Sequence, residues 1–448
     1  RKRRVGGEKA DIHEDAAPVQ KPDLIKGEGE GDVAEIEATQ TGVPFEGHPL
    51  APMGPFISAK GMESIIAHKY KGGDWTPLDR LLNVVWEGTL SLLPEWLAPN
   101  AITLLGLLCH VVYFALFVYL LLFTDISDPD SVLPRWAHGC AGVLVFAYSV
   151  LDAVDGKQAR RTGSSSPLGQ LFDHGADALA SMVFLPFALA WAVGIAGSWQ
   201  HSLLLVLSFL NLFCPQWEEA HTGCMRTAVG GMVGVSEAIL VVCAVFATSA
   251  CLGDLWWGQV LALAGGFPIT PAALLLAVYT VATGSVLVSC TANGKAEAGW
   301  AGTVDFLPAM GVLAAIPVLV LHGGGALVYY PGFHLVLGLG LAHLTSQRII
   351  TGMSKEEFPT GGQLVVRGAA GRRHLPDTCQ ALVSTPSQTS LSLLLCIDVV
   401  LHGGLGSSTA LAWLGDGEMI IAAMGWAFTM VYVNYTTAVL LQLSWGLG

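Results

Sequence analysis

Ten long apolar runs constrain the fold of this chain more than any other feature of its sequence. Each run is close to the ~20 residues that an α-helix needs to cross the hydrocarbon core of a bilayer. Apolar residues make up 52% of the 448 residues and charged residues only 13%, whereas a soluble domain carries about 25% charged residues. The sequence therefore predicts an all-α, polytopic membrane protein with about ten transmembrane helices. The runs are 101–123, 137–158, 168–196, 203–223, 232–252, 269–290, 303–321, 325–346, 387–405 and 419–444.

The segments around these runs differ in composition. Residues 1–55 are rich in Glu, Gly and Pro without an apolar period, which is typical of a disordered tail. No apolar core follows the basic start, so we expect no cleaved signal peptide. Residues 56–97 carry apolar side chains at helical spacing among charges, which predicts N-terminal amphipathic helices on the membrane surface. We expect a transmembrane core at 98–290 and helices 7–10 at 291–448, while the Gly-rich stretch 255–266 either extends a span or forms a loop.

Lys and Arg are distributed unequally between the two sets of loops. With ten spans and a cytosolic N-terminus, the loops after odd-numbered spans contain only Arg135, whereas the loops after even-numbered spans contain ten basic residues. This bias follows the positive-inside rule, so we expect the tail and the end of the second span to face the cytosol. The ten residues are Lys157, Arg160, Arg161, Arg226, Lys295, Arg348, Lys355, Arg367, Arg372 and Arg373.

Four aspartates lie where the second and third apolar runs meet. Asp152 and Asp155 are three residues apart, and Asp173 and Asp177 are four apart, so each pair lies on one face of its helix. A charge near the centre of a bilayer costs roughly 2.5–3.5 kcal/mol, so the cluster needs a compensating partner. Ligands that are all carboxylate oxygens indicate a hard divalent cation, Mg²⁺, Mn²⁺ or Ca²⁺.

Small residues and one arginine separate the two acidic pairs. Gly156, Ala159 and Gly169 would let a phosphate approach the backbone, and Arg160 could hold it with two parallel hydrogen bonds. The whole pattern reads D-x2-D-G-x2-A-R-x8-G-x3-D-x3-D. It resembles the signature of the CDP-alcohol phosphotransferases, integral membrane enzymes that transfer a phospho-alcohol from a CDP-activated donor.

Other segments resemble one branch of that family. The stretches HKYKGGDWTPLD and PEWLAPNAIT before the first long apolar run are similar to the eukaryotic choline and ethanolamine phosphotransferases. The stretch WEEAHTG resembles W-E-E-Y-H-T-G of the ethanolamine branch, with Ala220 where an aromatic residue is usual, and SEA, which contains Glu237, resembles a T-E of the same family.

The resemblance implies an enzyme of phospholipid biosynthesis. Its expected reaction is transfer of phosphocholine or phosphoethanolamine from CDP-choline or CDP-ethanolamine to diacylglycerol, which gives phosphatidylcholine or phosphatidylethanolamine and CMP, the final step of the Kennedy pathway. The resemblance implies two Mg²⁺ ions, with Mn²⁺ as a substitute, and a location in the endoplasmic reticulum or Golgi membrane with the active site facing the cytosol. A homodimer is a further expectation that the sequence leaves open.

The resemblance also assigns roles to the signature residues. Asp152, Asp155 and Asp173 would bind the first metal, and Asp177 would help to bind the second and is a candidate base. Residues that would line the CDP pocket in the catalytic core, 98–290, are Gly156, Ala159, Arg160 and Gly169, with Asn100 as a further contact to the donor.

The residues themselves suggest two other candidates for proton transfer. An alcohol needs a base within about 3 Å, and Asp177 is a poor base when a metal occupies its lone pairs. His174 lies three residues before Asp177, close to the same helical face, and an imidazole exchanges protons near neutral pH. Glu237 opens an apolar run at the same expected depth, so it could hold that imidazole or take the proton itself.

Alternative functions remain open at this point. A relative that uses CDP-diacylglycerol and an acceptor such as inositol would share the aspartates but usually has about six spans. A cation transporter could also carry intramembrane carboxylates, although it has no need for the Gly, Ala and Arg between them. We expect no nucleic-acid partner, because no basic patch with interleaved aromatics occurs. Nine cysteines without a C-x-x-C pair indicate neither a disulfide framework nor a zinc site.

Overall fold

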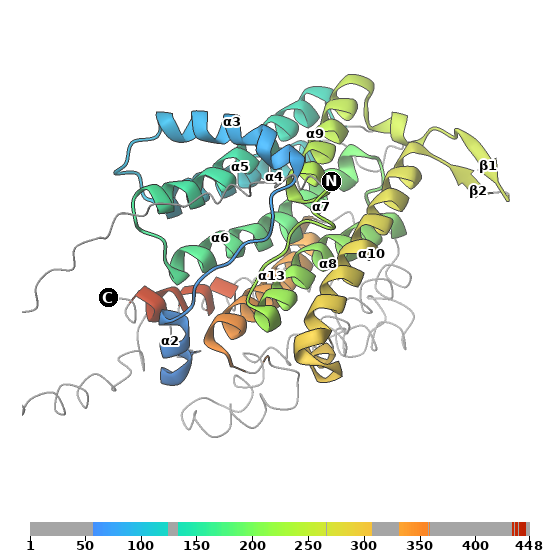
Figure 1. The fold of residues 1–448 in the computed structure, drawn as a ribbon. Helices are drawn as coiled ribbons and strands as arrows, with labels where there is room; N and C mark the ends of the chain where they lie inside the picture. The colour runs from blue at the N-terminus through green and yellow to red at the C-terminus, as the bar shows by residue number, and fades with distance from the viewer. Residues whose placement is uncertain are drawn as a thin grey trace, which may run out of the picture. The chain divides into compact units, whose positions relative to one another are not determined.

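Long helices make up most of the part of the chain that the computed structural model describes (Figure 1). The described residues are 57–123, 133–265, 267–306, 331–356, 358, 432–433, 435–437 and 439–444. The expected tail, 1–55, and the expected ninth span, 387–405, lie outside them, and the expected seventh and tenth spans are described only in part.

Two short amphipathic helices precede the long ones. Helix α2, Ala59–Ile66, begins after Ser58, whose side chain caps it, and α3, Pro77–Leu92, begins with a capping box between Thr76 and Asp79. On one side, α3 buries Trp86 against the Val150 and Val154 side chains of α5, Arg135–Arg161. On its other side, Leu81, Val84 and Leu92 are 68%, 74% and 83% exposed. A helix with two apolar faces needs a second apolar partner, and its position on a membrane surface stays a prediction.

Five helical stretches among the described residues are long and apolar enough to cross a membrane. They agree with the first, second, third, fifth and sixth expected spans, so an integral membrane protein is confirmed, whereas the total of ten stays a prediction. Helix α8, Trp199–Thr222, and α13, Pro331–Ser354, lie at the fourth and eighth expected spans. The five stretches are α4, Pro99–Phe123; α5; Pro167–Ala192; α9, Val235–Leu252; and the apolar part of α10, Pro271–Ala298.

The third stretch is interrupted in its middle. Helix α6, Pro167–Leu179, continues through a π-helical turn, η1 (Ala180–Phe184), into α7, Leu185–Ala192. Pro186 at the start of α7 has no N–H to donate to the preceding turn, which gives a local reason for the wider turn. Such π-turns frequently occur at functional sites, and this one begins three residues after Asp177.

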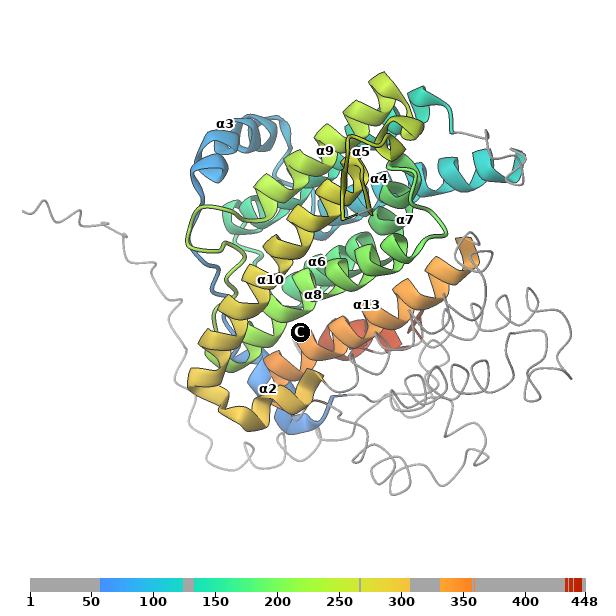
Figure 2. The ribbon, with the colours of Figure 1, turned by 90° about the vertical axis from the view of Figure 1, so that its right-hand side faces the viewer.

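The long helices pack side by side around this third stretch. Helix α5 lies between α4 and α9, and α8 lies between α10 and α13, as Figures 1 and 2 both show. One hydrophobic core joins α4, α5, α7, α8, α9 and α10, and a second joins α6, η1, α8 and α13. Helix α6 belongs to the second core and packs against α4 and α13, while its Asp173 approaches the aspartates of α5 and its His174 contacts Gln216 of α8.

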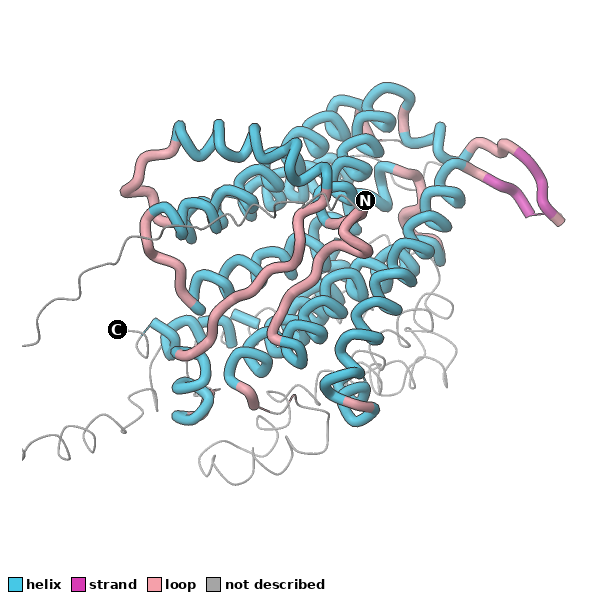
Figure 3. Tube along the Cα trace, viewed as in Figure 1, coloured by secondary structure: helices cyan, strands magenta, loops and turns pink. Residues whose placement is uncertain are grey.

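The Gly-rich stretch departs from the all-α expectation. After the 3-10 turn η2, Asp254–Gly258, strands β1, Ala262–Ala264, and β2, Phe267–Ile269, form a small antiparallel hairpin (Figure 3). Gly265 in the turn has a φ of 58°, a conformation that glycine adopts at low cost. The stretch is therefore a hairpin loop between two membrane helices and does not extend a span.

Candidate active site

A short turn brings the two acidic helix faces together. Helix α5 ends at Arg161, Gly163 adopts a φ of 66°, and Ser166 caps α6 by accepting from the Gly169 N–H at 3.1 Å. Pro167 follows at the first helical position, where its missing N–H costs nothing. Because the turn is tight, α6 returns alongside α5 and its aspartates face those of α5.

Three of the four carboxylates converge in one group. One oxygen from each of Asp152, Asp155 and Asp173 lies within 4.8 Å of the others. At this separation and an effective dielectric near 20, each ionised pair repels by about 3 kcal/mol. Asp173 Oδ1 is buried and has no hydrogen-bond partner among the described residues. A divalent cation with oxygen ligands would relieve the repulsion and fill this vacant acceptor, so the side chains fit such a metal.

The fourth carboxylate lies beside this group. Asp177 lies beside Asp152 and accepts a hydrogen bond from the Tyr148 hydroxyl. Asp155 in turn accepts from the Thr103 hydroxyl at 2.5 Å. Hydroxyl donors orient carboxylates without adding positive charge, so the negative charge of the cluster stays available for cations.

The residues expected to hold the CDP donor lie around the same turn in two groups. A Cβ on Gly156 would lie 3.5 Å from Arg160 Nη1, so the guanidinium lies over the space that the glycine leaves. A Cβ on Gly169 would lie 3.6 Å from Asn100 Oδ1, so α4 reaches the first turn of α6. Ala159, one turn after Asp155, accepts from the Ser164 N–H in the turn. The structure thus brings Asn100 next to Gly169 and Arg160 next to Gly156.

His174 lies on the side of α6 that faces α8. Its Nδ1 is 3.2 Å from Gln216 Nε2, and the ring of Tyr70 meets its ring edge-on at 5.6 Å between centroids. Burial, together with the negative charges of Glu219 and three of the site aspartates, raises the pKa of Tyr70 above its ordinary value. Tyr70 therefore stays protonated at neutral pH and lies within the electric field of the acidic cluster.

Glu237 is engaged at the start of its own helix. Its Oε2 accepts from the Gly234 N–H at 2.8 Å as part of a capping box, and the neighbouring Ser236 donates to Asp79 at 2.5 Å. The carboxylate thus stabilises the first turn of α9. Its expected part in proton transfer stays a prediction, as does that of His174.

The stretch of chain that contains these residues matches a known protein family. The profile of the CDP-alcohol phosphatidyltransferases matches residues 96–342, more than half of the sequence. The chain belongs to the CDP-alcohol phosphatidyltransferase family. Within this family, its relatives include a choline/ethanolaminephosphotransferase 2 of Arabidopsis thaliana, 38% identical over 207 residues, which are 46% of this chain and 50% of the plant protein.

Further relatives come from animals and from an amoeba. A cholinephosphotransferase 1 of Homo sapiens is 29% identical over 321 residues, which are 67% of this chain and 74% of the human protein. An uncharacterized CDP-alcohol phosphatidyltransferase class-I family protein of Dictyostelium discoideum is 35% identical over 210 residues, 46% of this chain and 50% of that protein. The chain spans about half the length of the first of these curated relatives.

Several residues beside this family's signature were missed by the sequence reasoning. Gln170 bridges His68 Nε2 and Glu219 Oε1, each at 2.9 Å, and it lies four residues before His174, on the same face of α6. That spacing is a sequence signal that could have identified Gln170. Tyr148, Thr103 and Gln216 had no such signal, because their partners are distant in sequence.

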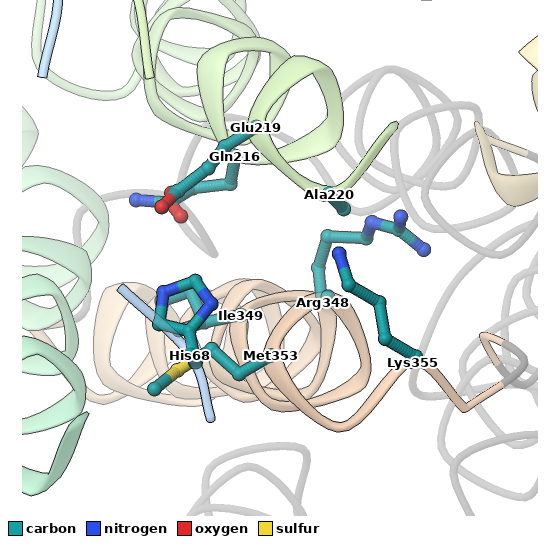
Figure 4. A pocket seen from close by; sticks show the side chains of 9 residues that line it. His68, Gln216, Glu219, Ala220, Arg348, Ile349, Met353 and Lys355 are labelled. Carbon is teal, nitrogen blue, oxygen red and sulfur yellow. The ribbon is translucent and has the colours of Figure 1, made fainter. Parts of the chain in front are cut away.

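A small cavity lies beside Gln216 and Glu219 of α8. It lies between α8, α13 and His68, as Figure 4 shows, and offers about 10 Å³ to the centre of a water molecule, which is room for about one water. Gln216 and Glu219 contribute to its wall from α8, and Ile349 and Met353 from α13. Gln216 thus lies between the cavity and His174. Burial and the positive charge of Lys355 lower the pKa of His68, so its imidazole is neutral at pH 7.

Proposed function

We propose that this protein transfers phosphocholine or phosphoethanolamine from CDP-choline or CDP-ethanolamine to diacylglycerol, with CMP as the second product. The observation that carries the proposal is the grouping of the Asp152, Asp155 and Asp173 oxygens within 4.8 Å, in signature order and next to Arg160. The printed names of the plant and human relatives supply the choline and ethanolamine classes. A cation transporter would not need the glycine and arginine positions that surround the carboxylates.

The acidic group would hold Mg²⁺ or Mn²⁺. Asp152, Asp155 and Asp173 would be ligands of one ion, and Asp177, in contact with Asp152, would serve a second. Divalent cations at such a site neutralise pyrophosphate charge and stabilise the leaving phosphate of CMP.

The remaining signature residues would bind and orient the donor. Arg160 offers a planar pair of N–H donors over Gly156, which suits two oxygens of a pyrophosphate. Gly169 and Asn100, which lie next to each other where α4 meets the first turn of α6, would contact the donor from that side. Phosphoryl transfer requires mainly positioning and charge stabilisation, so residues that orient the donor beside the carboxylates support the proposed reaction.

Proton removal from the diacylglycerol hydroxyl is assigned to His174, with Glu237 as the second candidate. The His174 Nδ1 atom contacts Gln216, and Nε2 is the ring nitrogen that would take the proton of an attacking hydroxyl. Glu237 would have to leave the Gly234 N–H before taking a proton.

The enzyme is further proposed to lie in the endoplasmic reticulum or Golgi membrane with this site facing the cytosol, where CDP-alcohols are dissolved. The Lys and Arg bias of the loops supports the orientation. The expected homodimer stays a prediction.

The first prediction is that CMP release requires a divalent cation and the acidic group. Full-length protein in diacylglycerol-containing nanodiscs should release CMP from CDP-choline or CDP-ethanolamine with Mg²⁺, and excess chelator should abolish release. Asp155→Asn should lower turnover by at least about a hundredfold, because it removes one anionic ligand of the group. Full turnover in chelator would contradict the metal assignment. CMP release only from CDP-diacylglycerol with a soluble alcohol such as inositol would assign the protein to the other branch of the family.

A further inference from the structure

The β1–β2 hairpin stands apart from the long helices, as Figures 1 and 3 show. Leu255, Val260, Leu261 and Leu263, in or beside the hairpin, are 63%, 59%, 59% and 70% exposed. No charged residue occurs in the sequence from 255 to 294. A contiguous exposed apolar surface marks a site of contact with a protein or a membrane, so the hairpin requires a partner outside the described residues.

Both faces of the hairpin are apolar. Leu263 lies opposite Pro268, and Ala262 lies opposite Ile269. Because successive residues of a strand point to opposite faces, these two pairs belong to different faces of the sheet. An antiparallel sheet with one face in water alternates apolar and polar residues, and this hairpin does not. A protein bound to one face would leave the other apolar face in water, so a surrounding apolar phase fits the pattern better.

Two membrane helices determine the level at which the hairpin lies. Helix α9 ends at Leu252 and α10 begins at Pro271, and both are long and apolar enough to span a bilayer. Arg135, at the start of α5, donates to the Cys251 and Leu252 carbonyls. The turn 162–166 follows the other end of α5, so the hairpin lies at the opposite end of the bundle from that turn. Its level is therefore the surface of the opposite leaflet.

The backbone of the hairpin limits how deep it can enter that leaflet. In the part of the chain that the structure describes, no third strand pairs with β1 or β2, so each strand has an unpaired edge. Such an edge does not occur in the hydrocarbon region, where no water satisfies the N–H and C=O groups. Water and headgroups can satisfy them at the interface, and Pro268 has no N–H to satisfy. The hairpin thus fits the boundary between headgroups and acyl chains.

We propose that the β1–β2 hairpin is an interfacial anchor whose partner is the bilayer leaflet opposite the turn 162–166. Ala262 and Leu263 contact lipid from the two faces of the hairpin. Because the hairpin joins α9 to α10 directly, it fixes the depth at which both helices enter that leaflet. This inference is independent of the reaction that the protein catalyses.

The deciding experiment measures what reaches each face of the hairpin. Ala262→Cys and Leu263→Cys are made in full-length protein whose native cysteines are replaced by alanine, labelled with a fluorophore and placed in phosphatidylcholine nanodiscs. A nitroxide on the lipid headgroup should quench both labels at least about threefold more strongly than a nitroxide at the end of the acyl chain. Iodide in the buffer should quench both labels at least about threefold less than a label on Ser164→Cys, because the interface hinders access of the ion.

Two exposed positions calibrate the quenchers. Ser164, in the turn 162–166, reports a site in water. Val278, 69% exposed on α10, lies about 10 Å along the helix from Pro271 and reports the hydrocarbon. We expect the acyl-chain nitroxide to quench Val278→Cys more strongly than the headgroup nitroxide does.

Other surroundings of the hairpin would give different results. Iodide quenching of both hairpin labels to the level of Ser164→Cys would show a hairpin in water and overturn the proposal. Protection of either label from iodide and from both nitroxides would mean that a protein surface covers it, from a second copy or another segment of this chain, and would also overturn it. The quenching pattern of Val278→Cys at Ala262→Cys and Leu263→Cys would contradict the interfacial level.

Hydrogen exchange supplies a test that needs no variant. The Leu261 N–H donates to the Ile269 carbonyl at 2.9 Å, but an isolated two-stranded hairpin is only marginally stable in water. In wild-type protein in nanodiscs, this amide should exchange at least about tenfold more slowly than in an unfolded chain, because the interface stabilises the hairpin. Exchange at the unfolded rate would overturn the proposal.

Discussion

At the scale of single residues, hydroxyl groups from neighbouring helices orient the site carboxylates. Tyr148 on α5 donates to Asp177 on α6, and Thr103 on α4 donates to Asp155 on α5. The close approach of α4 to α5 at this level depends on Gly106, where a Cβ would lie 3.2 Å from the Tyr148 ring. Because hydrogen bonds to charged groups contribute more than neutral ones, these donors should fix how the carboxylates meet a metal.

Removing the Tyr148 hydroxyl should weaken metal binding more than folding. Tyr148→Phe keeps the ring that packs edge-on against His110 at 4.2 Å but leaves Asp177 without its donor. A hydrogen bond to a charged group contributes about 1.5–3 kcal/mol, so the Mg²⁺ concentration for half-maximal CMP release should rise at least about tenfold. Tyr119→Phe, at an exposed position on α4, is the control. An unchanged Mg²⁺ requirement in Tyr148→Phe would mean that the hydroxyl does not orient Asp177 for a metal.

At the scale of the helices, glycines determine how closely neighbouring helices approach one another. A Cβ on Gly294 of α10 would come within 2.2 Å of the Trp217 ring on α8, and a Cβ on Gly338 of α13 within 2.6 Å of the Met182 carbonyl in η1. A Cβ on Gly352 of α13 would lie 2.9 Å from the Ala220 Cβ on α8. Small residues let membrane helices approach closely, and here they allow α10 and α13 to pack closely against α8 and η1.

Two glycines of α10 provide a matched pair for testing this packing. Gly294→Ala should destabilise the protein by about 1–3 kcal/mol, because the fully buried Trp217 cannot move away without strain. Gly284→Ala adds the same methyl group where no atom lies within 4 Å, and it should stabilise the helix by roughly 0.5–1 kcal/mol or leave it unchanged. Thermal unfolding in detergent monitors both variants. Equal unfolding temperatures for the two would show that the α8–α10 contact does not limit stability.

At the scale of the whole molecule, the segment 75–97 is held against the signature helix α5. Lys157 Nζ donates to Asn83 and Glu87 of α3. The same ammonium group lies 5.1 Å from the centroid of the Trp75 ring. Arg161 donates to two backbone carbonyls at the end of α3. These residues and Gln158, which donates to the Pro94 and Leu97 carbonyls, hold α3 along α5. Arg160 lies between Lys157 and Arg161 in the sequence, and its guanidinium lies over Gly156. The described elements all belong to one compact unit.

The expected orientation in the membrane is testable with two exposed loop positions. In a variant whose native cysteines are replaced by alanine, Ser164→Cys in the α5–α6 turn should react with a membrane-impermeant maleimide in sealed microsomes. Gln259→Cys, between η2 and the hairpin, should react only after permeabilisation, because α9 carries the chain to the opposite face. Labelling of Gln259→Cys in sealed microsomes would contradict the cytosolic assignment of the signature turn.

The sequence by itself determined the described helices and the grouping of the carboxylates. Apolar length predicts a membrane helix because the bilayer has one thickness, and the described spans follow the expected runs, although α10 ends eight residues beyond the expected run 269–290. The signature could be located for a similar reason: its residues lie on two helices joined by a five-residue turn, 162–166, so spacing in sequence translates directly into spacing on a helix face. The hairpin at 262–269 was not predicted, because Gly-rich loops carry no periodic signal.

Only the tertiary structure decided which partners hold the site residues. Tyr148 and Asp177 are 29 positions apart, His174 and Gln216 are 42, and Thr103 and Asp155 are 52. Such contacts depend on how far each helix is rotated and shifted against its neighbours, and that is set by the sum of many packing contacts between side chains. Hydropathy indicates that a segment is a helix, but it does not determine how far that helix is rotated about its own axis. For this reason the sequence identified His174 as a candidate base, and only the packing of α8 against α6 showed that Gln216 faces its Nδ1 atom.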